Sequence, residues 1–152
     1  MRALVQRVSE ARVLVAGETV GAIGPGLLVL FCAEAGDGEA ELAWMTKKIP
    51  ALRIFEDGAG RMNLDLAASG GAVLAVSQFT LAADLTRGNR PGFSRAAAPD
   101  LAEDLYDRFC AGLRGSGFAV ETGRFGAKMA VRLVNDGPTT LWLDTRETVR
   151  RP

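Results

Sequence analysis

Short runs of branched apolar residues, each bounded by a glycine or proline turn, constrain the fold of this chain more than any other feature. Residues 3–8, 12–15 and 26–31 are rich in Val and Leu, and turn sequences lie at 16–18 and 24–26. Runs of this length and composition between such turns are typical of β-strands. The first part of the chain is therefore predicted to form a β-meander.

Two longer segments carry the pattern of amphipathic helices. Residues 39–49 repeat apolar side chains at helical spacing, and Asp37 is the predicted N-cap. The second helix is predicted to begin at Pro99, because proline is well suited to the first helical position. Its predicted buried stripe consists of Leu101, Leu105, Phe109 and Leu113.

The rest of the pattern completes a fold with more strands than helices. Further strands are predicted at 53–55, 62–64, 72–76, 118–120, 128–134 and 140–143. The predicted fold class is α+β, with a mixed, largely antiparallel β-sheet core, barrel-like or two-layer, and two main helices packed on one side. The length of 152 residues, 48% of them hydrophobic, suits a single domain spanning residues 1–152.

The absence of histidine excludes several classes of enzyme site. Ser-His-Asp and Cys-His hydrolases need an imidazole base to activate the nucleophile. Cys32 and Cys110 are too few to close a structural zinc site, so no metal or other cofactor is expected. Both are predicted to be buried thiols, since free cysteines prefer protein interiors.

Charge and hydropathy restrict the surroundings and the partners of the chain. The 18 basic and 18 acidic residues leave no net charge, so a global positive field cannot hold a long nucleic acid. Residues 22–33 form the longest uncharged apolar stretch, which is too short to span a membrane. The N-terminus has a strand pattern rather than that of a signal peptide, so a cytoplasmic protein with no membrane association is expected.

Two short motifs stand where predicted apolar strands give way to polar residues. Residues 77–81 (SQFTL) follow the strand 72–76, and residues 135–140 (NDGPTT) follow the strand 128–134. The first motif presents a hydroxyl, an amide, an aromatic ring and a second hydroxyl. In the second, glycine lets the backbone approach a ligand closely, and the Gly-Pro bond tolerates the cis form. Recognition by main-chain groups is predicted at these strand ends.

These motifs resemble those of the D-aminoacyl-tRNA deacylases, a family that carries an SQ-x-x-L motif and an N-x-GP-x-T motif. The resemblance covers nearly the whole chain and includes residues 3–8, 53–55, 62–64, 90–91 and 122–125. It implies a homodimeric hydrolase that removes a D-amino acid, or glycine, from the 3′-terminal adenosine of tRNA. L-aminoacyl-tRNA is spared, so the implied role is proofreading in translation quality control.

The resemblance also assigns roles to individual residues. Gly137 and Pro138 are expected to form a cis step that enters the active site of the other subunit, where its carbonyl groups exclude an L side chain. The implied catalytic residues are Ser77, Gln78, Phe79 and Thr80. Substrate binding and chiral selection are expected to use Gly137, Pro138, Phe125, Asn135 and Arg7, the last of these as a supporting residue. The terminal 2′-hydroxyl of the tRNA is expected to assist hydrolysis.

Two readings from other functional classes remain open at this point. One is a noncatalytic dimer that binds RNA or adenosine in the same pocket. The other is a hydrolase of small esters or amides with Thr80 as nucleophile, although the sequence offers no histidine to activate that hydroxyl. Phe79 and Phe125 can equally be ordinary core aromatics. The arginines at 87, 90 and 95 can contact phosphates or lie on a solvated loop.

Overall fold

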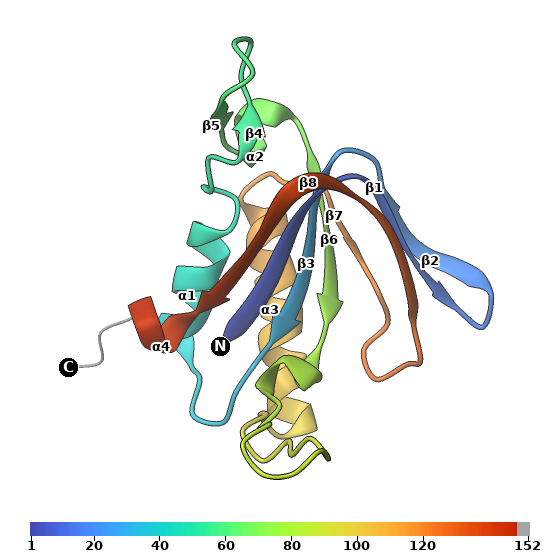
Figure 1. Cartoon of the computed structure of the whole chain (residues 1–152), viewed down its shortest axis with the longest axis vertical. Coiled ribbons are helices and arrows are strands. Elements are labelled where there is room, and N and C mark those ends of the chain that lie inside the picture. Colours follow the sequence, from blue (N-terminus) through green and yellow to red (C-terminus); the bar gives the residue numbers. More distant parts are fainter. Residues whose placement is uncertain (149–152) are drawn as a thin grey trace.

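The two longest strands of the sheet are antiparallel and pair with each other. The structure, a computed structural model, describes residues 1–148, in which β1 (Arg2–Val15) pairs with β8 (Ala130–Asp144) over nearly its whole length. The opposite edge of β1 is shared by two shorter strands, with β3 (Gly26–Cys32) on its first half and β2 (Glu18–Ile23) on its second. The curved shape of β1 and β8 is visible in Figure 1.

The remaining elements extend and cover this sheet. They are, in chain order, α1 (Glu39–Lys48), β4 (Phe55–Glu56), β5 (Met62–Leu64), α2 (Leu66–Ser69), β6 (Ala72–Ser77), the 3-10 helix η1 (Phe79–Ala82), α3 (Pro99–Gly115), β7 (Val120–Thr122) and α4 (Thr145–Thr148). β6 runs parallel to β3, and β7 runs parallel to β6. β4 and β5 form a separate small hairpin.

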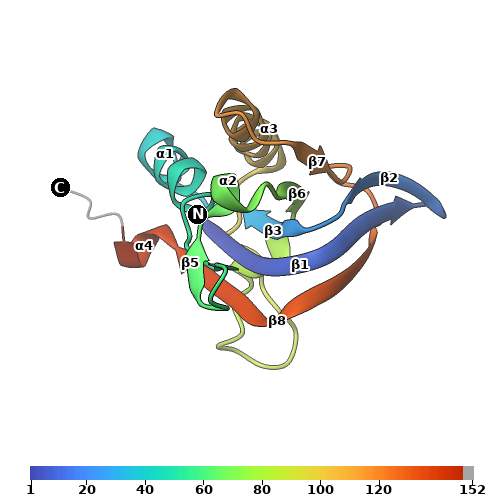
Figure 2. The ribbon, with the colours of Figure 1, turned by 90° about the horizontal axis from the view of Figure 1, so that it is seen from above.

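The sheet curls until its two ends almost meet. A Cβ at Gly21 of β2 would lie 2.2 Å from the carbonyl oxygen of Thr122 in β7, so only glycine permits this close approach. Helices α1 and α3 lie side by side on one face of the sheet, as Figure 2 shows. The predicted α+β class, with a mixed, barrel-like sheet and two main helices on one side, is confirmed.

The core lies between these helices and the sheet. Phe31 of β3 stacks on Phe109 of α3 with ring centroids 4.7 Å apart, and both side chains are buried. Leu105 and Leu113 extend the same buried stripe of α3, as predicted. Leu101 is 40% exposed, contrary to the prediction, because the first turn of α3 extends past the end of the sheet toward η1 (Figure 1).

The strand predictions at the two ends of the chain were wrong in their boundaries. Residues 3–8 and 12–15 belong to one continuous strand, and residues 18–23 form a strand that was not predicted. In the same way, β8 runs through residues 130–144 without a break at the Gly-Pro step. Register shifts between β1 and β8 absorb the irregular residues, so the ladder continues past them.

The start of α1 also differs from the prediction. Gly38 is the N-cap, and Asp37 lies outside the helix. The Asp37 carboxylate accepts a hydrogen bond from the Glu34 amide at 2.7 Å and lies 2.6 Å from the α-ammonium group of Met1. The charge on Met1 therefore draws Asp37 away from the helix terminus. No helix within residues 1–148 is long and apolar enough to cross a membrane.

Candidate active site

The SQFTL motif lies where β6 leaves the sheet. Ser77 is the last residue of β6 and pairs with Phe31, and the Gln78 amide donates a hydrogen bond of 2.7 Å to the Phe31 carbonyl. The chain then turns into η1, which begins at Phe79. The first amide groups of such a helix have no partner within it, so the Phe79 and Thr80 amides can donate to another acceptor.

A buried ionic cluster holds η1 against the end of β1. The Arg2 guanidinium donates a 2.7 Å hydrogen bond to the Leu81 carbonyl in η1. Its Nε atom lies 3.3 Å from Glu34 Oε1 and 3.2 Å from Asp144 Oδ2. Burial raises the pKa of Glu34, and the nearby Asp144 and Asp37 carboxylates raise it further against the opposing effect of Arg2.

The side chains of the motif point in different directions. Gln78 Nε2 donates a hydrogen bond of 2.5 Å to Thr80 Oγ1, so this hydroxyl is held by an amide and not by a base. Phe79 is 54% exposed and meets Phe93 edge to face, with ring centroids 5.1 Å apart. An aromatic ring this exposed is not a core residue, so the reading of Phe79 as an ordinary core aromatic is wrong.

A cavity of about 480 Å³ joins this motif to a distant part of the chain. Ser77, Gln78 and Phe79 line it together with Phe125, which lies on the connection between β7 and β8. The rest of the lining consists of Phe31, Cys32, Ala33, Val76, Ala96, Ala97, Pro99, Ala102, Gly126, Ala127, Met129 and Val131. The site is thus an apolar pocket with a few hydrogen-bonding groups at one wall, as ligand pockets commonly are.

Cys32 is the titratable side chain in this lining. Burial, with a smaller effect of Glu34, raises the pKa of the Cys32 thiol to about 11. The thiol is therefore protonated at neutral pH and is a poor nucleophile. Cys110 is likewise buried, as predicted for both cysteines. Within residues 1–148, no three Asp, Glu, Cys or His side chains lie together as metal ligands.

The Gly-Pro step forms a second group of site residues with a buried anchor. The bond between Gly137 and Pro138 is cis. Asn135 Nδ2 donates hydrogen bonds of 3.0 Å to the carbonyl groups of both Arg7 and Thr139. These bonds hold together residues 135–139, which we call the Gly-Pro corner. Arg7 Nε lies 3.0 Å from Asp136 Oδ2 and donates to the Asp136 carbonyl at 3.2 Å. Arg7 is therefore a buried contact of this segment, and its role in substrate selection stays a prediction.

The two motifs lie far apart within one chain. Ser77 pairs with Phe31, which pairs with Ala3, whereas Asn135 pairs with Val8. Ala3 and Val8 are separated by about 17 Å along β1, at roughly 3.3 Å per residue. In Figure 1 the middle of β8 arches over the top of the sheet, and the yellow-green turn after β6 lies at the bottom. A single chain therefore does not bring Gly137 and Pro138 to the pocket.

Several residues of the site were missed from the sequence. Ala96 and Ala97 form part of the wall, and Phe93 supports Phe79. The run of alanines before Pro99 was a possible signal, because small side chains leave room for a ligand. Arg2 carries no signal of this kind, since its contact with Leu81 depends on the approach of distant segments.

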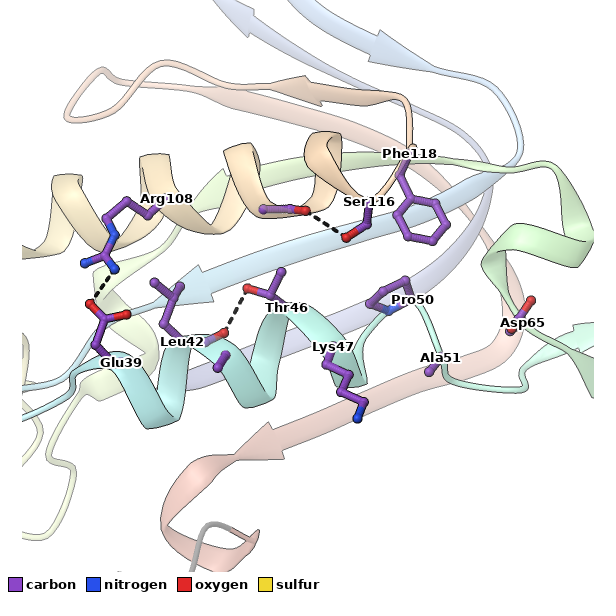
Figure 3. A pocket seen from close by; sticks show the side chains of 12 residues that line it. Glu39, Leu42, Thr46, Lys47, Pro50, Ala51, Asp65, Arg108, Ser116 and Phe118 are labelled. Carbon is purple, nitrogen blue, oxygen red and sulfur yellow. Dashed lines mark hydrogen bonds and ion pairs between the residues drawn. The ribbon is translucent and has the colours of Figure 1, made fainter.

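A second groove of about 540 Å³ lies between α1 and α3 (Figure 3). Arg108 and Glu39 form an ion pair across one end, and Thr46 donates a hydrogen bond to the carbonyl of Leu42 in its own helix. Lys47 points out of the groove. In this second groove, Arg108, Glu39 and Thr46 already have polar partners. The smaller cavity at the SQFTL motif is therefore the better candidate for chemistry.

Comparison with known proteins shows which family the chain belongs to. The sequence profile of the family described as D-Tyr-tRNA(Tyr) deacylase matches residues 4–144. The chain belongs to this family. The D-aminoacyl-tRNA deacylase of Cereibacter sphaeroides (strain KD131 / KCTC 12085) is 59% identical over 145 residues, which cover 95% of this chain and 100% of that protein. The family indicated by the two sequence motifs is confirmed.

Further comparisons extend the similarity to another D-aminoacyl-tRNA deacylase and to solved structures. The D-aminoacyl-tRNA deacylase of Symbiobacterium thermophilum is 55% identical over 148 residues, covering 97% of this chain and 98% of that protein. A solved structure named c-Myc DNA Unwinding Element Binding Protein is 40% identical, with a TM-score of 0.90, 95% of this chain covered and 98% of the other. A second, described as a probable eukaryotic D-amino acid tRNA deacylase, is 22% identical over 93% of this chain and 97% of the other; its TM-score of 0.77 shows a shared fold.

Proposed function

We propose that this chain hydrolyses the ester bond of D-aminoacyl-tRNA and releases the free D-amino acid and tRNA. The observation that carries the proposal is the pocket, in a chain of the deacylase family, that Ser77, Gln78 and Phe79 line together with Phe125. Glycine mischarged on tRNA is a second substrate of the same site. The protein acts as one domain in the cytoplasm, where it serves as a proofreading enzyme of translation.

The proposed roles follow the chemistry of the lining. The terminal adenine stacks on the aromatic rings of Phe79 and Phe125, and Ser77 and Gln78 form hydrogen bonds with the substrate. The Phe79 and Thr80 amides donate to the carbonyl oxygen of the ester, on which negative charge develops as the bond breaks. The pocket has no general base, so the 2′-hydroxyl of the terminal ribose assists hydrolysis.

Chiral selection is proposed to require a second copy of the chain. Gly137 and Pro138 are exposed, and they lie far from the pocket of their own chain. In a homodimer they enter the pocket of the partner subunit, where their carbonyl groups leave room for a hydrogen but not for an L side chain. Arg7 and Asn135 hold this corner in place, so its main-chain atoms act as a firm steric barrier.

The Thr80 nucleophile and the noncatalytic binding module are less well supported. Thr80 Oγ1 accepts a hydrogen bond from Gln78, and an amide donor does not increase the nucleophilicity of a hydroxyl. A noncatalytic adenosine-binding dimer would use the same cavity but would leave the ester intact. The binding module predicts no turnover, whereas the Thr80 nucleophile predicts turnover without tRNA that Thr80→Ala would abolish.

The experiment is to follow amino-acid release from D-tyrosyl-tRNA, L-tyrosyl-tRNA and glycyl-tRNA at catalytic amounts of protein. Loss of the D-tyrosyl and glycyl esters, with the L-tyrosyl ester intact, is the expected result. Survival of all three esters would overturn the hydrolase assignment and favour the binding module. Loss of the L-tyrosyl ester at a similar rate would overturn the proposed role of Gly137 and Pro138.

A further inference from the structure

Two loops beside the pocket carry an excess of positive charge. The loop between η1 and α3, residues 83–98, contains Arg87, Arg90 and Arg95, and the connection 123–129 contains Arg124 and Lys128. Asp84 is the one acidic residue in these two segments. The whole chain has equal numbers of basic and acidic residues, so the positive excess is a local property of these two loops. We call these five basic residues the basic rim.

The basic rim is free of the ion pairs that occupy other arginines. Arg2, Arg7, Arg108 and Arg146 each lie within 4.0 Å of a carboxylate oxygen. Within residues 1–148, no such ion pair involves a residue of the basic rim, and all five are exposed. The Asp84 carboxylate accepts hydrogen bonds from the Thr86 amide at 2.9 Å and the Thr86 hydroxyl at 2.6 Å. These bonds, with a smaller effect of the charge on Arg95, lower the pKa of Asp84. These cations therefore remain available to an anionic partner.

Backbone hydrogen bonds, an aromatic contact and chain continuity connect both loops to the pocket. Asp84 and Gly92 bond to each other through two backbone hydrogen bonds of 2.7 and 3.0 Å, and the next residue, Phe93, packs on Phe79. The Arg95 carbonyl accepts a 2.9 Å hydrogen bond from the amide of Ala35. On the other side, Arg124 and Lys128 directly flank residues 125–127, which line the cavity. The positive charges thus lie on loops that adjoin the pocket wall, and none of the five residues lines the cavity itself.

We infer that the basic rim binds the phosphate groups of the single-stranded 3′ end of tRNA, next to the adenosine in the pocket. This inference rests on the proposed function, because it names how the same substrate is held outside the reacting ester. Guanidinium groups are suited to phosphate by charge and by their paired N–H donors. Each phosphate contact releases a counterion, so binding should weaken as salt is added.

The test compares substrates with and without phosphates. A triple variant, R87Q/R90Q/R95Q, removes three charges from exposed positions. On D-tyrosyl-tRNA the kcat/KM of this variant should fall below that of the unaltered chain. Loss of three phosphate contacts should reduce the slope of log kcat/KM against log salt concentration by about 2. The ratio of unaltered to variant kcat/KM should therefore be about 20-fold larger at 50 mM than at 200 mM salt. On 3′-O-D-tyrosyl-adenosine, which has no phosphate, kcat/KM should match that of the unaltered chain.

A matched control variant, K47Q/K48Q/R61Q, removes the same charge far from the pocket. These residues are exposed at the end of α1 and in the turn between β4 and β5. The control should retain the salt dependence of the unaltered chain. Thermal unfolding of both variants shows that each is folded before the kinetic comparison.

The outcomes separate the inference from the proposed function. If the unaltered chain cleaves D-tyrosyl-tRNA and the rim variant behaves like the control, the inference is overturned and the hydrolase assignment stands. An equal loss on 3′-O-D-tyrosyl-adenosine would also overturn it, because the loop would then be shaping the pocket. If the unaltered chain cleaves neither substrate, the proposed function fails, and the inference fails with it.

Discussion

The guanidinium group of Arg7 offers the sharpest test of how the Gly-Pro corner is held. Arg7 is 4% exposed, and its side chain donates a 2.5 Å hydrogen bond to the Ile54 carbonyl in addition to its contacts with Asp136. The substitution Arg7→Met keeps an unbranched apolar stem and removes every donor. It leaves the Ile54 carbonyl without this partner and the corner without its anchor.

The expected magnitude follows from the two contacts. A buried hydrogen bond with a charged donor contributes about 1.5–3 kcal/mol, and the pair with the half-exposed Asp136 carboxylate contributes about 0–1 kcal/mol. Arg7→Met should therefore lower the free energy of unfolding by about 2–4 kcal/mol. With a urea m-value of about 2 kcal/mol/M, the midpoint should fall by about 1–2 M.

Urea unfolding, together with D- and L-ester hydrolysis, provides the assay. Asp136→Asn is the matched control, since it removes only the exposed carboxylate and should lower stability by less than about 1 kcal/mol. In Arg7→Met the ratio of D-ester to L-ester hydrolysis should fall, because the steric barrier is no longer held in place. A change in stability below about 1 kcal/mol would refute the anchoring role, and an unchanged D/L ratio would refute its link to chirality.

Two further substitutions test the pocket, and two further measurements test the burial of the cysteines. Phe79→Ala should lower kcat/KM on D-tyrosyl-tRNA by roughly 5- to 150-fold through lost base stacking of about 1–3 kcal/mol, mostly in KM. Because Phe79 is 54% exposed, urea unfolding should show a loss of less than about 1.5 kcal/mol. Thr80→Val should retain kcat within about tenfold in single-turnover assays, whereas a nucleophilic role predicts a loss of more than about 1,000-fold. Burial raises the pKa of both Cys32 and Cys110 from 9.0 to about 11, so neither thiol should react with a disulfide reagent at pH 8 in the folded protein. The folded state then holds the thiol protons more tightly than the unfolded state does. The free energy of unfolding should therefore decrease as pH rises from 9.0 to about 11. A constant free energy of unfolding across this range would contradict the burial of both thiols.

Local pattern in the sequence predicted most of the elements and the chemical character of the site. The continuous apolar runs 26–31 and 72–76 are typical of buried strands, and both form strands. Helix α3 begins at Pro99 as expected, because proline sets the backbone of a first helical turn. The absence of histidine restricts the chemistry whatever fold the chain adopts.

Only the tertiary structure decided how these elements join. The continuity of β8 through Gly137 depends on its ladder with β1, and the displacement of Asp37 from the helix depends on the Met1 ammonium group. The presence of Phe79 and Phe125 in one cavity depends on the parallel pairing of β6 and β7. Periodicity records which face of an element is buried, whereas register, bulges and ion pairs arise between segments distant in the chain. For this reason the residue types of the site could be read from the sequence, and the separation of its two motifs could not.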